Sequence, residues 1–399
     1  MDLILRGATR QGDSTRVDIG IDEGRIVQIG RIPSKGIREI EANGRLVIPG
    51  FVDPHIHLDK ILTADRYNWT TRSQQGLDPT LLANQASEPL KREFTEEDVY
   101  RRARTAVEML AYHGTLYIRA NVDVDQTIGL NGLKGVLRAR DACRDLVDMQ
   151  IVAFAQNGIY AEDGNLELLR TALESGAGVI GGLPEIDRDD AHAHLDRIFE
   201  LATEYEVDVE AHIDQSRVAR PFNLPYFLEK VEQQGFQGRA LAIHCFGLAF
   251  VPPDIARQTL EQARENAVSI AFTPYEYVAP RGKAPLGSGV NTAYCTDNIR
   301  DTWQPFDGGD QLQTGLFFAR TSLMRSTEEL NTVLEMATHR AAQAIGLKGY
   351  GIKEGHAADL VVLDASTASE AVIGQSEKLL VLKRGEIIRR SARLRVQFP

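Results

Sequence analysis

Eight short apolar segments run through the middle of this 399-residue chain and alternate with helical patterns such as residues 96–112 and 330–345. Their length and their β-branched residues are typical of buried strands. Strand–helix alternation predicts a parallel sheet, and eight units in about 300 residues favour a (β/α)8 TIM barrel over an open sheet. The predicted strands are residues 46–57, 115–119, 150–154, 178–182, 207–210, 240–244, 268–272 and 291–295.

A nucleotide-binding open sheet is the main alternative fold. Its glycine fingerprint should follow a strand and open a helix. The glycine-rich stretch Gly129 to Gly135 follows no predicted strand closely and opens no clear helix, so we expect a loop there. The barrel remains the favoured fold.

The two ends of the chain differ from its middle. Short strand patterns separated by turn residues occur at 3–6, 16–21 and 25–30, and again at 359–364, 379–383 and 386–388. We expect the two ends to pair into one small β-sandwich. The predicted domains are therefore residues 1–48 plus 350–399 for the sandwich and 49–349 for the barrel.

Composition excludes several classes of partner. A formal charge of −11 argues against nucleic acid, which needs a basic surface, and no apolar run is long enough to cross a membrane. Three scattered cysteines without a Cys-x-x-Cys motif fit a cytoplasmic protein and exclude the Cys-x-x-Cys zinc deaminases. We expect a small-molecule substrate, and a homo-oligomer is compatible with the sequence.

Two His-x-His pairs occur, and their contexts differ. His55 and His57 end an apolar strand, where side chains two apart point to the same face and both imidazoles can bind one metal ion. His192 and His194 lie in a segment with helical periodicity, where residues two apart do not face each other. We interpret this second pair as part of an ordinary amphipathic helix.

Polar side chains also end the other predicted strands, at the barrel end where catalytic residues gather. Four histidines and an aspartate stand out. Three nitrogen ligands and one carboxylate, with a position left for water, suit Zn²⁺ or Fe²⁺. The complete set of polar residues at or just after the predicted strand ends is His55, His57, Asn121, Asp123, Gln156, Asn157, Glu185, His212, Asp214, Gln215, His244 and Asp297.

Motifs along the whole chain resemble those of the amidohydrolase superfamily, and of its cytosine deaminase-like branch in particular. The chain is also similar to N-isopropylammelide isopropylamidohydrolases. The motifs are PGFVDPHIHLDK (49–60), VAFAQNG (152–158), EAHID (210–214), AIHC (242–245), TDNIRDTW (296–303), ATHRAAQAIGL (337–347) and GHAADLVVLD (355–364).

The resemblance implies roles for individual residues. It makes His55, His57, His212 and Asp297 the ligands of one divalent metal ion, Zn or Fe. Asp297 would also take the proton of the attacking water, and His244 would contact that water and the substrate. Gln156 would bond the substrate's ring edge. The fourth strand ends in Gly-Gly-Leu-Pro-Glu (181–185) without the lysine that two-metal relatives carry, so one metal is expected.

One position departs from the family pattern. Cytosine deaminases carry a proton-shuttling glutamate three residues after the fifth-strand histidine, and here Gln215 stands at that catalytic position. An amide cannot carry a proton in this way. Three explanations stay open: another acid such as Asp297 recycles the proton, Gln215 is an engineered replacement, or the chain is a non-catalytic relative.

Several neighbouring residues each have two or more roles that fit the sequence. Lys60 can pair with Asp59 or another neighbour, or touch the substrate, and Trp303 can be a substrate platform or simple packing. Asn298 stands where a second aspartate often follows the metal-binding one, and it is a further candidate for substrate binding. Tyr275 and Tyr277 are expected to line the pocket rim.

The predicted activity is metal-dependent hydrolysis of a non-peptide C–N bond in a small cyclic amide, amidine or amino-substituted heterocycle. Deamination of a cytosine-like ring is the leading case. Release of an N-alkylamine from a triazine, or opening of a cyclic amide, is a close alternative. A binding or scaffold protein on an inactive barrel is the alternative from another class.

Overall fold

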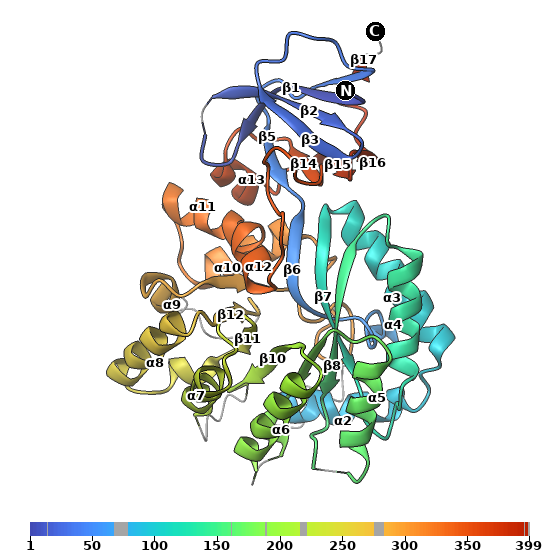
Figure 1. Ribbon diagram of the computed structural model, residues 1–399, viewed down its shortest axis with the longest axis vertical. Coiled ribbons are helices and arrows are strands. Elements are labelled where there is room, and N and C mark those ends of the chain that lie inside the picture. Colours follow the sequence, from blue (N-terminus) through green and yellow to red (C-terminus); the bar gives the residue numbers. More distant parts are fainter. Residues whose placement is uncertain are drawn as a thin grey trace.

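The computed structural model contains an eight-stranded sheet rolled into a barrel and a nine-stranded sheet that lies above it (Figure 1). It describes residues 1–13, 15–67, 79–160, 162–187, 190–215, 222–274, 283–394 and 396–397. Tyr275 and Tyr277 lie outside the described residues. No helix among those described is both long and apolar enough to span a membrane.

The barrel consists of eight parallel strands in sequence order, as predicted. Its strands are β6 (Phe51–His57), β7 (Thr115–Asp123), β8 (Asp148–Ala155), β9 (Val179–Gly182), β10 (Asp208–Ile213), β11 (Ala240–His244), β12 (Ser269–Phe272) and β13 (Thr292–Tyr294). The first and last strands join through a bridge between Ile56 and Asp297. The Asp297 N–H donates to the His55 carbonyl at 3.0 Å, and the His57 N–H donates to the Asp297 carbonyl at 2.7 Å. This contact closes the barrel beside the predicted ligands.

Helices surround the barrel and cover its apolar outer face (Figure 1). Helix α3 has the predicted bounds because Thr95 caps its first turn and three acidic residues favour its N-terminus. The helices are α2 (Pro79–Lys91), α3 (Glu96–Tyr112), α4 (Asn131–Ala142), α5 (Asn165–Glu174), α6 (Ala191–Glu204), α7 (Leu224–Gln234), α8 (Pro253–Glu265), α9 (Lys283–Gly287), α10 (Gln311–Thr321), α11 (Thr327–Met336), α12 (His339–Ala344) and α13 (Ala368–Gly374), with 3-10 turns at Ala64–Arg66, Pro184–Ile186 and Phe246–Ala249.

The loop predicted for Gly129 to Gly135 is wrong from residue 131 onward, because α4 begins there. Gly135 lies inside α4, where a Cβ atom would come within 2.7 Å of the Val99 side chain and 2.8 Å of the Glu96 carbonyl oxygen. Glycine therefore permits the close approach of α3 and α4. Gly135 thus serves helix packing, whereas Gly129, with a φ angle of 57°, lies in the turn before the helix.

The single helical segment predicted over 330–345 is two helices. Ser326 and Glu329 form a capping box that starts α11, and α11 ends at Met336. The Ala337 carbonyl then accepts a hydrogen bond at 2.9 Å from the Val52 N–H of the barrel. This tertiary contact takes a carbonyl that a continuous helix would use, and α12 begins two residues later.

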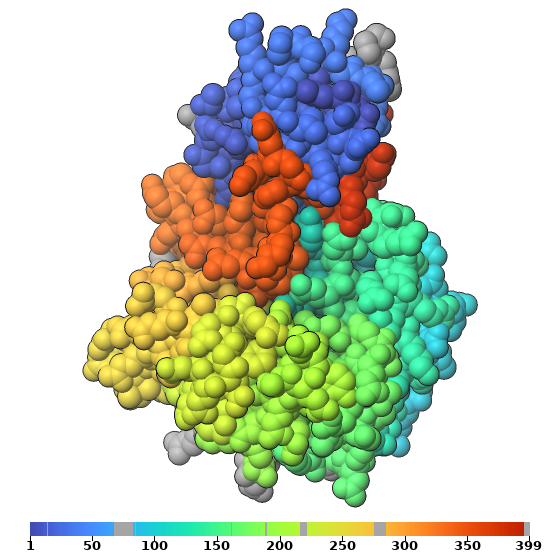
Figure 2. Space-filling model, viewed as in Figure 1, coloured from blue at the N-terminus to red at the C-terminus, as the bar shows by residue number. Residues whose placement is uncertain are grey.

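The second sheet combines both ends of the chain, as predicted for the sandwich. N-terminal strands in blue and C-terminal strands in red lie together above the barrel (Figures 1 and 2). Its strands are β1 (Leu3–Arg10), β2 (Arg16–Asp22), β3 (Arg25–Gly30), β4 (Arg38–Glu41), β5 (Leu46–Pro49), β14 (Leu360–Leu363), β15 (Lys378–Lys383), β16 (Glu386–Arg390) and β17 (Val396–Gln397).

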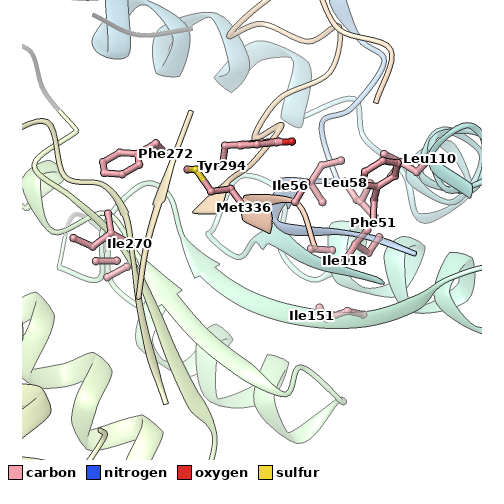
Figure 3. Close-up of a cluster of buried hydrophobic side chains, with 14 of the residues drawn as sticks. Phe51, Ile56, Leu58, Leu110, Ile118, Ile151, Ile270, Phe272, Tyr294 and Met336 are labelled. Carbon is pink, nitrogen blue, oxygen red and sulfur yellow. The ribbon is translucent and has the colours of Figure 1, made fainter. Parts of the chain in front are cut away.

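The apolar run 46–57, predicted as one strand, is divided at Gly50. β5 pairs with β1 and β14, whereas β6 pairs with β7 of the barrel. A Cβ atom on Gly50 would lie 2.5 Å from the Leu116 side chain, so glycine is required where the chain passes from one sheet to the other. The main core packs barrel strands against helices, and Figure 3 shows some of its members, among them Ile56, Ile118, Leu110 and Met336.

Candidate metal centre

Four histidines and one aspartate converge at the C-terminal ends of the barrel strands. His55 and His57 end β6, His212 lies on β10, His244 ends β11, and Asp297 follows β13; all five are buried. Strand alternation explains the first pair, because Ile56 between them points outward into the core. The structure thus brings together residues that are up to 242 positions apart in the sequence.

The ligand atoms of these five side chains lie at distances from one another that are compatible with a metal site. The ring nitrogens of His55, His57 and His212 lie within 4.8 Å of one another, and so do the ligand atoms of His55, His244 and Asp297. Asp297 Oδ1 lies 2.9 Å from His55 Nε2 and 3.4 Å from His57 Nε2. Distances of about 2.0–2.2 Å from each donor to a central divalent ion fit this spacing.

Unsatisfied ring nitrogens support this fit. Nε2 of His212 and Nε2 of His244 are buried and have no hydrogen-bond partner among the described residues. Burial, the charge of Lys60 and neighbouring rings hold the pKa of His57 well below its usual value, and burial next to His55 does the same for His212. Neutral imidazoles are the form that binds a metal ion.

His55 and Asp297 carry opposite charges in this arrangement. Burial acts to lower the pKa of His55, but Glu210 and Asp297 outweigh it and raise that pKa to about 9. Burial acts to raise the pKa of Asp297, but the bond from His55 keeps it below its usual value. A metal ion that binds here therefore competes with a proton on His55.

Second partners orient two of the histidine rings. His55 Nδ1 lies 2.7 Å from Glu210 Oε1, and the same oxygen accepts a hydrogen bond from Asn121 at 2.6 Å. His212 Nδ1 lies 3.1 Å from Gln215 Oε1. An acceptor at Nδ1 directs the Nε2 lone pair of each ring toward the cluster.

Gln215, predicted at the catalytic position, contacts a predicted ligand directly. Its backbone N–H donates to Glu185 Oε2 at 3.1 Å, which holds the backbone of Gln215 just after β10. Burial and the neighbouring Asp214 raise the pKa of Glu185 to about 8. In this geometry Gln215 acts as a hydrogen-bond acceptor for His212 rather than as an acid.

The strand ends turn sharply where these residues sit. Asp214, His244 and Asp297 have φ angles of 52°, 70° and 60°, in the left-handed region. Non-glycine residues rarely adopt this conformation, which is enriched at functional sites. Asp53 stabilises one of these turns, because its carboxylate accepts hydrogen bonds from the Thr296 N–H and hydroxyl just before Asp297.

The three predicted substrate-binding residues lie around the cluster. Gln156 Oε1 accepts a hydrogen bond at 3.0 Å from Lys60, whose ammonium is 6.0 Å from the centre of the Trp303 ring. The Trp303 backbone N–H donates to Asp301 at 2.8 Å, which fixes the loop carrying the ring. Asn298 is buried, and its side-chain oxygen has no hydrogen-bond partner within the described part of the chain.

Sequence reasoning missed Glu210 and Lys91. Glu210 had a readable signal, because it lies two residues before His212 on the same strand and therefore faces the same side. Lys91 had none, since this buried residue of α2 contacts Asp123 and Asp125 across 32 and 34 positions. The second histidine pair behaves as predicted: it begins α6, where His194 bonds Asp187 at 2.7 Å.

The fold is an eight-stranded parallel barrel whose strand ends carry a His-x-His pair, two further histidines and an aspartate. This combination is typical of a class of metal-dependent hydrolases. Residues 38–389 match the Amidohydrolase family. The chain belongs to this family, whose members include enzymes that act on C–N bonds other than peptide bonds.

Similar proteins cover nearly the whole chain. N-isopropylammelide isopropyl amidohydrolase of Pseudomonas sp. (strain ADP) is 32% identical over 398 residues, which are 97% of each chain. Among solved structures, 5-methylcytosine deaminase from Klebsiella pneumoniae superposes with a TM-score of 0.90 at 27% identity over 97% of each chain. N-isopropylammelide isopropylaminohydrolase from Burkholderia multivorans gives 0.85 at 29% identity, covering 97% of this chain and 98% of the other.

Proposed function

We propose that this protein hydrolyses the exocyclic C–N bond of a small amino-substituted heterocycle and releases ammonia or an amine. The observation that carries the proposal is the buried cluster of His55, His57, His212, His244 and Asp297 at the catalytic end of the barrel. The similarity of the whole chain to a 5-methylcytosine deaminase and to an N-isopropylammelide isopropyl amidohydrolase supports this reaction.

The residues of the cluster have distinct roles in the proposal. His55, His57, His212 and Asp297 hold one divalent ion, which supplies Lewis acidity and makes water more acidic. The Asp297 carboxylate takes the proton of the attacking water and returns it to the departing nitrogen. His244 donates from Nε2 to the developing charge, because the Thr273 hydroxyl, 3.4 Å from Nδ1, can donate to that nitrogen.

The test combines metal analysis with a substrate screen. We expect about one equivalent of Zn or Fe in the purified protein, and amine release from at least one aminopyrimidine or aminotriazine. Assays for ammonia and for alkylamine on matched amino and N-alkylamino rings distinguish deamination from N-dealkylation. Protein treated with a chelator is the control, and activity should return with added metal. Absence of both metal and turnover would favour the inactive scaffold.

Gln215 provides a separate prediction. We expect Gln215→Glu to raise kcat on cytosine-like rings about tenfold or more, because a carboxyl group can carry a proton to the ring and the leaving amine. Steady-state ammonia release measures the effect. Gln215→Met is the matched control, since it removes the amide without adding an acid. An unchanged rate for Gln215→Glu would show that Gln215 does not limit this chemistry.

A further inference from the structure

The carboxylate of Glu185 holds the backbone that follows the predicted ligand His212. Glu185 lies in the 3-10 turn after β9, the strand that pairs with β10. Its Oε1 atom accepts a hydrogen bond from the Asp214 N–H at 2.5 Å, and its Oε2 atom accepts one from the Gln215 N–H at 3.1 Å. Two successive backbone donors thus bind the two oxygens of one carboxylate.

The conformation of Asp214 explains why this turn needs an anion. Its φ angle of 52° lies in the left-handed region, which costs free energy for a residue other than glycine. Consecutive N–H groups at such a turn form a concavity that binds anions, and here the carboxylate of Glu185 fills it. The bonds to Glu185 therefore stabilise a strained turn at the end of β10.

The same turn is tied to the start of α7. Asp214 is 2% exposed, and its two oxygens accept hydrogen bonds from the N–H groups of Asn223 at 2.7 Å and Leu224 at 3.3 Å. The Asn223 side chain donates to Glu185 Oε1 at 3.2 Å. The donors around Glu185 favour its charged form, against burial and the Asp214 charge, which raise its pKa to about 8. Gln215 thus starts from a fixed backbone position.

The side chain of Gln215 connects this turn to the predicted metal ligand. Gln215 is 3% exposed, and its Oε1 atom lies 3.1 Å from His212 Nδ1. An amide oxygen held at this place accepts the Nδ1 proton and leaves Nε2 of His212 as the nitrogen that binds a metal ion. Nε2 is buried and has no hydrogen-bond partner among the described residues. The hydrogen bonds that Glu185 accepts are from the turn and Asn223, so its effect on His212 acts through Gln215.

We propose that Glu185 is a positioning residue for metal binding, which fixes the turn at Asp214 so that the amide oxygen of Gln215 orients the His212 ring. This inference rests on the proposed function, and it adds a residue outside the cluster on which metal affinity depends. It also gives Gln215 a task that needs no transferable proton.

A double-mutant cycle on Zn²⁺ affinity tests the inference without requiring turnover. Glu185→Gln keeps the shape of the side chain but offers one acceptor oxygen to two backbone N–H groups. We expect it to weaken Zn²⁺ binding at least about tenfold, measured on chelator-treated protein with a competing chelator. Gln215→Met should weaken binding similarly, because His212 loses its acceptor. In the Gln215→Met background, Glu185→Gln should cause less than about a threefold further loss.

Asp187→Asn is the matched control. Asp187 lies two residues after Glu185 and also accepts a backbone N–H, that of Ile159 at 2.8 Å, but it bonds neither residue 214 nor residue 215. We expect a lower melting temperature and a Zn²⁺ affinity within about threefold of wild type. The visible absorption of Co²⁺-loaded protein is a second readout, since it reports ligand geometry. Glu185→Gln and Gln215→Met should shift it alike, and the control should not shift it.

Equal losses of Zn²⁺ affinity from Glu185→Gln in the two backgrounds, or no loss in the wild-type background, would overturn the inference. If Glu185→Gln does not fold, Glu185→Asp takes its place in the cycle, because it keeps both oxygens but shortens the side chain by one methylene group. A wild-type protein that binds no Zn²⁺ would reject the proposed function as well. Additive losses in a protein that binds Zn²⁺ and releases amine would reject the inference alone.

Discussion

Asp297→Ala should reduce turnover by at least about a thousandfold, because this one change removes both the proposed metal ligand and the proposed acceptor of the water proton. Asp297 Oδ1 lies within 3.4 Å of the Nε2 atoms of both His55 and His57, so no other described carboxylate is as well placed for these two tasks. Amine release under single-turnover conditions, with metal content measured on the same sample, gives the result.

Asp301→Asn is the matched control for this prediction. Asp301 lies four residues after Asp297 and is also buried, and burial raises the pKa of its carboxyl to about 7. Its Oδ1 atom accepts backbone hydrogen bonds that asparagine can keep. We expect turnover of the control to stay within about tenfold of wild type, since the change does not touch the cluster. Activity surviving in Asp297→Ala would remove Asp297 as the base.

Glu210→Gln is expected to weaken metal binding about 10- to 100-fold, because His55 loses the charged acceptor that orients its ring. The same change leaves Arg119, which is 2% exposed and 3.6 Å from Glu210 Oε2, without its buried counter-charge. We therefore also expect a loss of about 3 kcal/mol in the free energy of unfolding. Metal titration against a competing chelator and denaturant unfolding measure the two effects.

Asp208→Asn separates a local effect on the metal from a general effect of charge. Asp208 lies on the same strand, is partly exposed, and approaches the same arginine at 3.8 Å. Exposed ion pairs contribute less than about 1 kcal/mol, so this control should change neither measurement much. Equal metal affinities in Glu210→Gln and the wild type would mean that His55 is oriented by other contacts.

The barrel could be predicted from the sequence because each strand is a local apolar run. The convergence of the strand-end histidines could also be predicted, because parallel strands end on one side of the barrel. The break at Gly50 could not, since a continuous apolar run does not show that its two halves pair with different partners. The break between α11 and α12 depends on the carbonyl of Ala337 bonding Val52 of a distant strand.

The candidate site likewise has one part that the sequence could predict and another that it could not. Residue types and spacing predicted which histidines would meet, because their positions follow from the strands alone. The pairing of Lys60 with Asp123 rather than with its neighbour Asp59 depends on the path of the chain after β6 and on α2, which places Lys91 on the same carboxylate. Short-range pattern carries no information about such a contact.

The bridge between β6 and Asp297, just after β13, has a consequence for the order in which the protein matures. His55 and His57 are synthesised some 240 residues before Asp297, and the backbone hydrogen bonds that place them together form only when the last strand has joined the first. A nascent chain that ends before β13 contains the three histidines proposed as ligands but lacks the Asp297 carboxylate and the backbone pairing that position them. If these residues bind the metal as proposed, the complete four-ligand site forms only after barrel closure, when nearly three quarters of the chain has been made.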